Sequence, residues 1–247
     1  MRRPSSPYAS TFSFGPGPIS TTLQALIGAN VVAFVARFLV GPIFDDALGL
    51  HPAEVIHSFR VWQLATYMFL HGGVFHIVFN MLALWIFGAE LERTWGTRYF
   101  LKFYFVTGIG AGLLTVLFSL LPFGFARQLQ YVNIIGASGA IYGLLLAYAM
   151  YFPERPILLI VFWVPARLCV IILGAIAVFA SLSDAGGVAN ATHLGGLLVG
   201  YLYLKGGHVD PLSEMKYRYL KWKINRLRKK FDVYSGGRTD DVDRRVH

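Results

Sequence analysis

The 247-residue sequence has few charged residues and almost no cysteine. Only 14% of its residues are Asp, Glu, Lys or Arg, whereas an average soluble domain contains about 25%. The single cysteine, Cys169, excludes an intramolecular disulfide and any metal site built from several thiolates. Hydrophobic residues make up 55% of the chain, and the mean hydropathy is +0.55. This balance is typical of membrane proteins rather than soluble enzymes.

Six apolar segments are predicted to cross the membrane, since a span requires about 20 mostly apolar residues. Their ranges are 19–40, 66–90, 99–121, 134–151, 165–182 and 190–204. The expected fold class is therefore all-α, a polytopic membrane protein with a bundle of six transmembrane helices that occupies residues 19–205. The preceding residues 1–18 are rich in Pro, Ser and Gly and are expected to form a flexible cytoplasmic tail.

The distribution of Lys and Arg predicts the orientation of these spans. An even number of spans puts both termini on one side, and 19 of the 22 Lys and Arg residues fall on that side. The other side keeps Arg37, Arg60 and Arg127. Both termini are therefore expected to face the cytoplasm. No internal repeat is evident, which makes a transporter a less favoured hypothesis.

The basic tail, residues 206–247, carries 11 of the 22 Lys and Arg residues of the chain, whose net charge is +9. Eight Lys or Arg lie within 216–230 with no acidic residue among them, and four apolar residues recur there and just beyond on one helical face. These four are Leu220, Ile224, Leu227 and Phe231. The pattern predicts an interfacial helix at about 213–231 that binds anionic inner-leaflet lipid. A solvated run of charge is the alternative, and nucleic acid is not an expected partner.

A serine between small residues, Ser138, lies at the start of the fourth predicted span. A lone serine in a membrane helix is usually a packing residue. Two other spans, however, carry His76 and His193 to a similar depth, a turn or two below the outer face, and Asn80 lies close to the same level. Ionisable groups inside a membrane are costly and usually functional. The common depth therefore favours one shared site.

Glycines make contact between the serine and a histidine possible. A Ser–His hydrogen bond needs about 2.6–3.2 Å, whereas packed helices usually lie about 8–10 Å apart. The glycines concerned are Gly136, Gly139 and Gly143 in the fourth span, and Gly196 and Gly200 in the sixth. Because small residues four apart let backbones approach closely, they are predicted to bring His193, as general base, against Ser138, as nucleophile. Tyr142, four residues after the serine, is expected to stack on the His193 ring.

No carboxylate lies near the predicted site, since Glu90 and Glu92 are at the opposite, cytoplasmic end of the second span, so a Ser-His dyad is expected rather than a triad. His76 and Asn80 are four residues apart and share a helical face. Both side chains carry N–H groups that can stabilise an oxyanion, together with the backbone N–H of Ser138. His71, His76 and His193 could instead hold zinc, but catalytic zinc sites usually have tighter ligand spacing. Neither a metal nor another cofactor is therefore expected.

These stretches resemble the rhomboid family of intramembrane serine proteases, and the resemblance covers about residues 15–205. The matching pieces are 62–80 (WQLATYMFLHGGVFHIVFN), 90–92 followed by Trp95 and Gly96, 136–139, and His193 with Gly196 and Gly200. The resemblance implies a six-helix core of the basic bacterial form, in the inner membrane, with a water-filled cavity open to the outside. It also implies that Ser138 is the nucleophile, that His193 is the base, and that His71 has a supporting role. Thr192 departs from the family pattern, which often has Ala before the histidine.

The activity that the resemblance implies is the hydrolysis of peptide bonds within or next to transmembrane segments of membrane proteins. Transmembrane proteins would then be the substrates. A helical peptide bond in lipid is closed to attack because its carbonyl is already hydrogen-bonded, so a substrate helix must first unwind. The alternative, from a different class, is a catalytically silent rhomboid-like protein that binds single-span proteins. The intact pair of Ser138 and His193 favours the protease.

Overall fold

The structure, a computed structural model, describes residues 18–159, 161–181 and 187–206. The predicted N-terminal tail, apart from its last residue, lies outside these ranges. The basic tail beyond residue 206 and its interfacial helix at 213–231 also lie outside them. The predictions for both tails therefore stay predictions.

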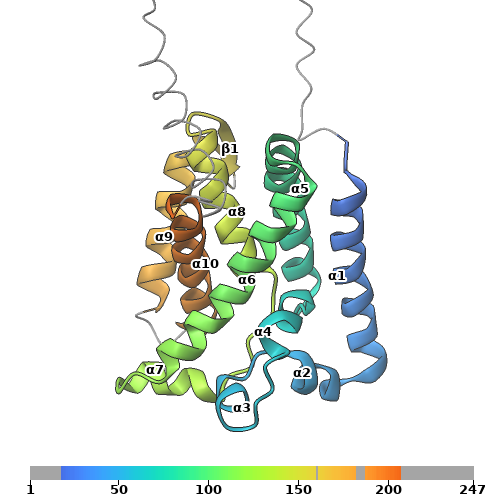
Figure 1. Cartoon of the computed structure of the whole chain (residues 1–247), viewed down its shortest axis with the longest axis vertical. Helices are drawn as coiled ribbons and strands as arrows, with labels where there is room; N and C mark the ends of the chain where they lie inside the picture. The colour runs from blue at the N-terminus through green and yellow to red at the C-terminus, as the bar shows by residue number, and fades with distance from the viewer. Residues whose placement is uncertain (1–17, 160, 182–186, 207–247) are drawn as a thin grey trace, which may run out of the picture. The chain divides into compact units, whose positions relative to one another are not determined.

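Six longer helices form the main part of the described chain, which is predominantly helical. Three of them are long and apolar enough to cross a membrane: α1 (Thr21–Val40), α5 (Val74–Trp95) and α6 (Thr97–Ser119). The others are α8 (Ser138–Tyr151), α9 (Ala166–Ser181) and α10 (Gly187–Lys205). Helices α5, α6 and α8 contact one another, α10 packs against α6 and α8, and α1 lies beside α5 (Figure 1). These apolar helices are those of an integral membrane protein.

Short helices connect the long ones at one end of this part of the chain (Figure 1). Between α1 and α5 lie α2 (Pro42–Leu48), α3 (Pro52–His57), α4 (Gln63–Thr66) and η1 (Tyr67–Phe69). Between α6 and α8 lie α7 (Gly124–Gln128) and η2 (Leu129–Tyr131). Pro52 begins α3 at its first position, where a proline lacks only an N–H that would be unpaired in any case.

The second predicted span begins too early at residue 66, because α5 starts only at Val74. Gly73, directly before it, is extended, with φ −174° and ψ 170°. The adjacent Gly72 and Gly73 disfavour a continuous helix, since glycine loses more backbone entropy on ordering than any other residue. His71 therefore lies in the connection before α5 and not within the helix.

The fourth predicted span also begins too early, because α8 starts at Ser138 itself. A few residues earlier the chain is extended, where Ile134 pairs with Leu50 in an antiparallel bridge. Gly136 has a φ of +132°, a conformation that other residues rarely adopt. The serine consequently lies at the junction of an extended segment and a helix.

The described chain is mostly helical, as predicted, but two short strands form a hairpin between α8 and α9. Strands β1 (Pro156–Leu159) and β2 (Phe162–Pro165) are antiparallel, and Pro156 lies opposite Pro165. The segment is short, rich in β-branched and aromatic residues, and bounded by prolines. These features favour a strand pair over a helix.

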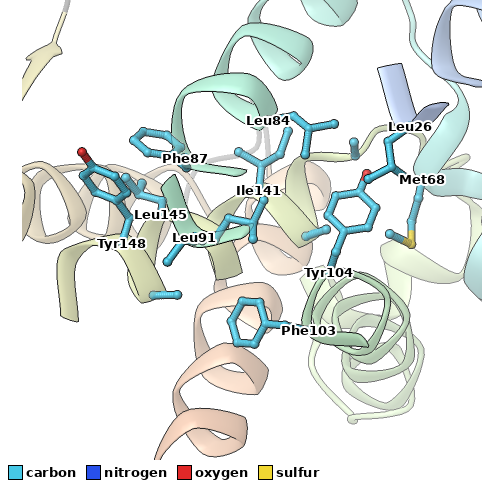
Figure 2. Packing of buried hydrophobic residues seen from close by; sticks show 14 of the residues in the cluster. Leu26, Met68, Leu84, Phe87, Leu91, Phe103, Tyr104, Ile141, Leu145 and Tyr148 are labelled. Atoms are coloured by element: carbon cyan, nitrogen blue, oxygen red, sulfur yellow. The ribbon is translucent and has the colours of Figure 1, made fainter. Parts of the chain in front are cut away.

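Helix α8 is at the centre of the packing, with contacts to α5, α6, α9 and α10. Figure 2 shows the buried side chains where α8 and α5 come together: Ile141, Leu145 and Tyr148 from α8, and Leu84, Phe87 and Leu91 from α5. The Phe87 and Tyr148 rings lie 5.2 Å apart. This packing holds α8 against α5, and it therefore fixes the position of the helix that carries Ser138 relative to the helix that carries His76.

Candidate active site

Ser138 and His193 lie in hydrogen-bonding contact. Nε2 of His193 is 2.8 Å from Oγ of Ser138, within the range needed for proton transfer. Both side chains are partly exposed, whereas the neighbouring Ala137 and Gly139 are buried. Nδ1 of His193 has no hydrogen-bond partner among the described residues. With its hydrogen on Nδ1, the neutral imidazole can accept the serine hydroxyl hydrogen at Nε2.

Tyr142 holds the histidine ring by stacking. The ring centroids of Tyr142 and His193 are 4.2 Å apart, and the planes are inclined by only 5°. Tyr142 lies one helical turn after Ser138, so the same helix presents both the hydroxyl and the aromatic ring. This stack restricts rotation of the imidazole, which is the role that a carboxylate has in a Ser-His-Asp triad.

The contact depends on a close approach of α8 and α10. A Cβ added to Gly196 would overlap the carbonyl oxygen of Gly139. One turn further along, a Cβ at Gly200 would lie 3.2 Å from Cα of Gly143. The two glycine pairs therefore face each other, and at Gly196 any side chain would force the helices apart.

Gly136 lies beside both the His76 ring and Ser138. Its N–H donates to the carbonyl of Tyr67 at 2.9 Å, which fixes the extended segment before α8. A Cβ on Gly136 would lie 2.9 Å from Nε2 of His76 and 3.6 Å from Oγ of Ser138. The histidine nitrogen and the serine oxygen thus border the same small space, which a side chain at position 136 would fill.

His76 of α5 borders this space, whereas the described hydrogen bond of Asn80 stays within α5. Nδ1 of His76 accepts a hydrogen bond from the N–H of Gly72 at 3.3 Å, which leaves Nε2 as the nitrogen that faces Gly136. The Asn80 amide donates to the carbonyl of His76, one turn earlier in the same helix, at 2.7 Å. One amide hydrogen is therefore used within α5, and the second is left for another acceptor.

His71 lies beside His76 in an edge-to-face contact, with the ring centroids 5.0 Å apart. The side chain is buried, and neither ring nitrogen has a hydrogen-bond partner among the described residues. This arrangement suits a packing role against His76. Within the described ranges, no three His, Cys, Asp or Glu side chains come close enough together to hold a metal ion.

Two residues that contact the site, Tyr67 and Thr115, were not assigned to it from the sequence. Tyr67 supplies the carbonyl that holds Gly136, and its buried hydroxyl donates to the carbonyl of Gly108 at 2.7 Å. The departure at Thr192 is accommodated by Thr115 of α6, because the two hydroxyl oxygens lie 3.0 Å apart. Contacts to backbone carbonyls leave no side-chain pattern, so one sequence alone gives no signal for Tyr67. The Thr115–Thr192 pair joins α6 to α10 next to the histidine.

Comparisons with known proteins show the family to which the chain belongs. A rhomboid domain model matches residues 58–208, more than half of the chain. RHOMBOID-like protein 1 of Arabidopsis thaliana is 30% identical over 228 residues, which cover 76% of this chain and 54% of that protein. Rhomboid protease GluP of Bacillus subtilis is 31% identical over 155 residues, or 63% of this chain and 28% of that protein. Rhomboid protease GlpG of Salmonella paratyphi A is 27% identical over 212 residues, or 85% of this chain and 69% of that protein.

The chain spans about half the length of several of the curated relatives that it matches. The region matched by the family model nevertheless contains every residue of the candidate site. The chain belongs to the rhomboid family, as its own motifs predicted.

Proposed function

We propose that the chain is an intramembrane serine endopeptidase that cuts transmembrane proteins within or next to their membrane-spanning segments. The observation that carries the proposal is the 2.8 Å contact between Ser138 Oγ and His193 Nε2, made by residues 55 positions apart. A serine that only packs helices needs no imidazole beside it, and an ionisable side chain inside a membrane is costly and usually functional. Two bacterial relatives that are named rhomboid proteases also support a protease function.

The reaction follows from the geometry. Oγ of Ser138 attacks the substrate carbonyl carbon, and Nε2 of His193 takes the hydroxyl proton. The resulting oxyanion is stabilised by N–H donors, for which His76, Asn80 and the backbone of Ser138 are the candidates. The imidazolium then gives its proton to the leaving amine, and the substrate stays esterified to Ser138. A water molecule, deprotonated by His193, hydrolyses this ester and restores the serine.

The length of α8 supports a site below the membrane surface. Its 14 residues extend about 21 Å at about 1.5 Å per residue, whereas the hydrocarbon core is about 30 Å thick. A helix this short leaves its first residue, Ser138, inside the membrane thickness, where water has to reach it through the protein. The proposal counts six spans, α1, α5, α6, α8, α9 and α10, with both termini in the cytoplasm and the site nearer the outer face. A bacterial plasma membrane is the proposed location.

The direct test is cleavage by the purified full chain in liposomes. The test substrate is a single-span protein with helix-breaking residues near the outer end of its span, because a helix must unwind before attack. Cleavage within or beside the span is expected, and EDTA should leave its rate unchanged. Binding without cleavage would support the silent binder instead, and loss of cleavage in EDTA that zinc restores would support a metal site.

Replacing Asn80 by Ala is expected to lower kcat by about 10²–10³-fold, the usual cost of one oxyanion donor. Labelling of Ser138 by a fluorophosphonate should stay detectable, because the nucleophile and base are intact. The matched control is Asn30→Ala. Asn30 is also buried, and its amide donates to the carbonyl of Leu26, one turn earlier in α1, at 2.8 Å. Equal losses of kcat in both variants would show that Asn80 contributes to helix packing only.

A further inference from the structure

A chain of polar contacts leads from the end of α1 to the ring of His76. Arg37, in the last turn of α1, donates through Nε to both carboxylate oxygens of Asp45, at 2.9 and 2.6 Å. Its Nη1 donates to the carbonyl oxygen of His71 at 3.1 Å. The two side chains are only 27% and 15% exposed, so this ion pair is partly shielded from water. One guanidinium therefore joins α1, α2 and the connection that precedes α5.

The carbonyl of His71 and the N–H of Gly72 belong to one peptide unit. Arg37 donates to the carbonyl, and the N–H donates to Nδ1 of His76. Because the peptide group is planar, a partner that fixes the direction of its carbonyl also fixes the direction of its N–H. A charged donor on the carbonyl also polarises the amide, which strengthens hydrogen bonds further along the chain.

The N–H of Gly72 determines which nitrogen of His76 carries the hydrogen. A neutral imidazole has one N–H and one acceptor nitrogen. Since Nδ1 accepts from Gly72, the hydrogen lies on Nε2, the nitrogen that faces Gly136 beside Ser138. This tautomer can donate to a developing oxyanion. The other tautomer would direct a lone pair toward the same negative charge.

The backbone of this connection is poorly restrained by its own residues. Gly72 and Gly73 are adjacent glycines, and a Cβ at Gly73 would meet nothing within 4 Å. The neighbouring His71 ring has no hydrogen bond through either nitrogen among the described residues. Among the described residues, the hydrogen bond to the His71 carbonyl comes from Arg37, so without Arg37 this peptide would be held only through its N–H to His76.

We propose that Arg37, held by Asp45, is a positioning residue that orients the His71–Gly72 peptide and thereby keeps His76 in its Nε2–H tautomer for the oxyanion. The inference rests on the proposed function, since it assigns His76 to oxyanion stabilisation. It assigns a role to Arg37 of α1 and Asp45 of α2, which act through the backbone and not by contact with the substrate.

The experiment compares Arg37→Gln and Asp45→Asn with the unaltered chain. One readout is kcat and KM on the single-span substrate, and the other is ¹⁵N NMR of protein labelled in histidine, with the His76 signal assigned from a His76→Gln variant. The unaltered chain should show His76 with its hydrogen on Nε2. Arg37→Gln should give a mixture of the two His76 tautomers. It should also lower kcat by about 10- to 100-fold, because the loss of a complete oxyanion donor usually costs about 10²–10³-fold. KM should change little. Asp45→Asn should change the tautomer ratio and kcat in the same direction by a smaller amount. It replaces Arg37→Gln as the test if that variant does not fold.

The matched control is Arg60→Gln. Arg60 pairs with Glu54 at 3.0 Å in the same connection between α1 and α5, and its described side-chain hydrogen bonds go to Glu54 and to the Asp46 carbonyl rather than to residues 71–76. Its loss should leave both the tautomer and kcat unchanged. A hydrogen on Nδ1 of His76 in the unaltered chain would overturn the proposal, as would an unchanged tautomer in Arg37→Gln whatever the effect on kcat. If the chain cleaves no substrate, the proposed function fails, while the NMR comparison still decides whether Arg37 sets the tautomer.

Discussion

Replacing Ser138 by Ala is expected to abolish substrate cleavage and labelling by a fluorophosphonate probe. The probe reacts with an activated serine hydroxyl, and Ser138 Oγ lies 2.8 Å from the nitrogen that would accept its proton. Nucleophile and base act as a unit, so loss of either in a serine protease lowers kcat on the order of 10⁶-fold. His193→Ala should therefore be nearly as severe as Ser138→Ala. In-gel fluorescence of the labelled protein and the rate of cleavage measure the two effects separately.

The matched control for this prediction is Ser119→Ala. Ser119 is a fully buried serine of α6, and its hydroxyl donates to the carbonyl of Val116 in the same helix at 2.7 Å. It represents the packing role that most membrane serines have, so its loss should leave labelling and cleavage unchanged. Labelling that survives Ser138→Ala, or that is unchanged in His193→Ala, would contradict the dyad.

Uniform apolar runs made parts of the fold predictable. Helices α1 and α6 begin and end within two residues of the predicted spans, because nothing in those runs interrupts the helical pattern. The starts of α5 and α8 could not be placed, because they depend on the preceding glycines and on tertiary pairing. The bridge between Leu50 and Ile134 joins segments that are 84 positions apart, and hydrophobicity along the chain carries no information about it.

The side chains of the candidate site were easier to group from sequence than their supports. Depth along the spans and helical spacing placed Ser138, His193 and Tyr142 near one another, and the structure has them in contact. Arg37 and Tyr67 were not grouped with them, because each reaches the site through a backbone carbonyl. Such contacts depend on the path of the main chain, which residue type does not specify.

The last prediction separates the packing of α8 and α10 from the chemistry. Gly196→Ala adds one carbon atom, which would overlap the Gly139 carbonyl oxygen. Helix α10 must then move away from α8 and take His193 with it. A displacement of about 1 Å can lower the rate on the order of 100-fold, so cleavage should fall at least that far. Fluorophosphonate labelling should slow in parallel, because it depends on the same contact between Ser138 and His193.

Gly28→Ala is the matched control, since it makes the same change in α1 at a position where the added Cβ would meet nothing within 4 Å. It should keep full activity and gain slightly in stability, because Ala is favoured over Gly in a helix by about 0.5–1 kcal/mol. Thermal unfolding of each variant shows whether it is folded. If Gly196→Ala does not fold, Gly200→Ala gives the graded test, because its Cβ would lie 3.2 Å from Cα of Gly143 and requires only a small shift. A folded Gly196→Ala variant that cleaves at the normal rate would show that close approach of these helices does not place the histidine.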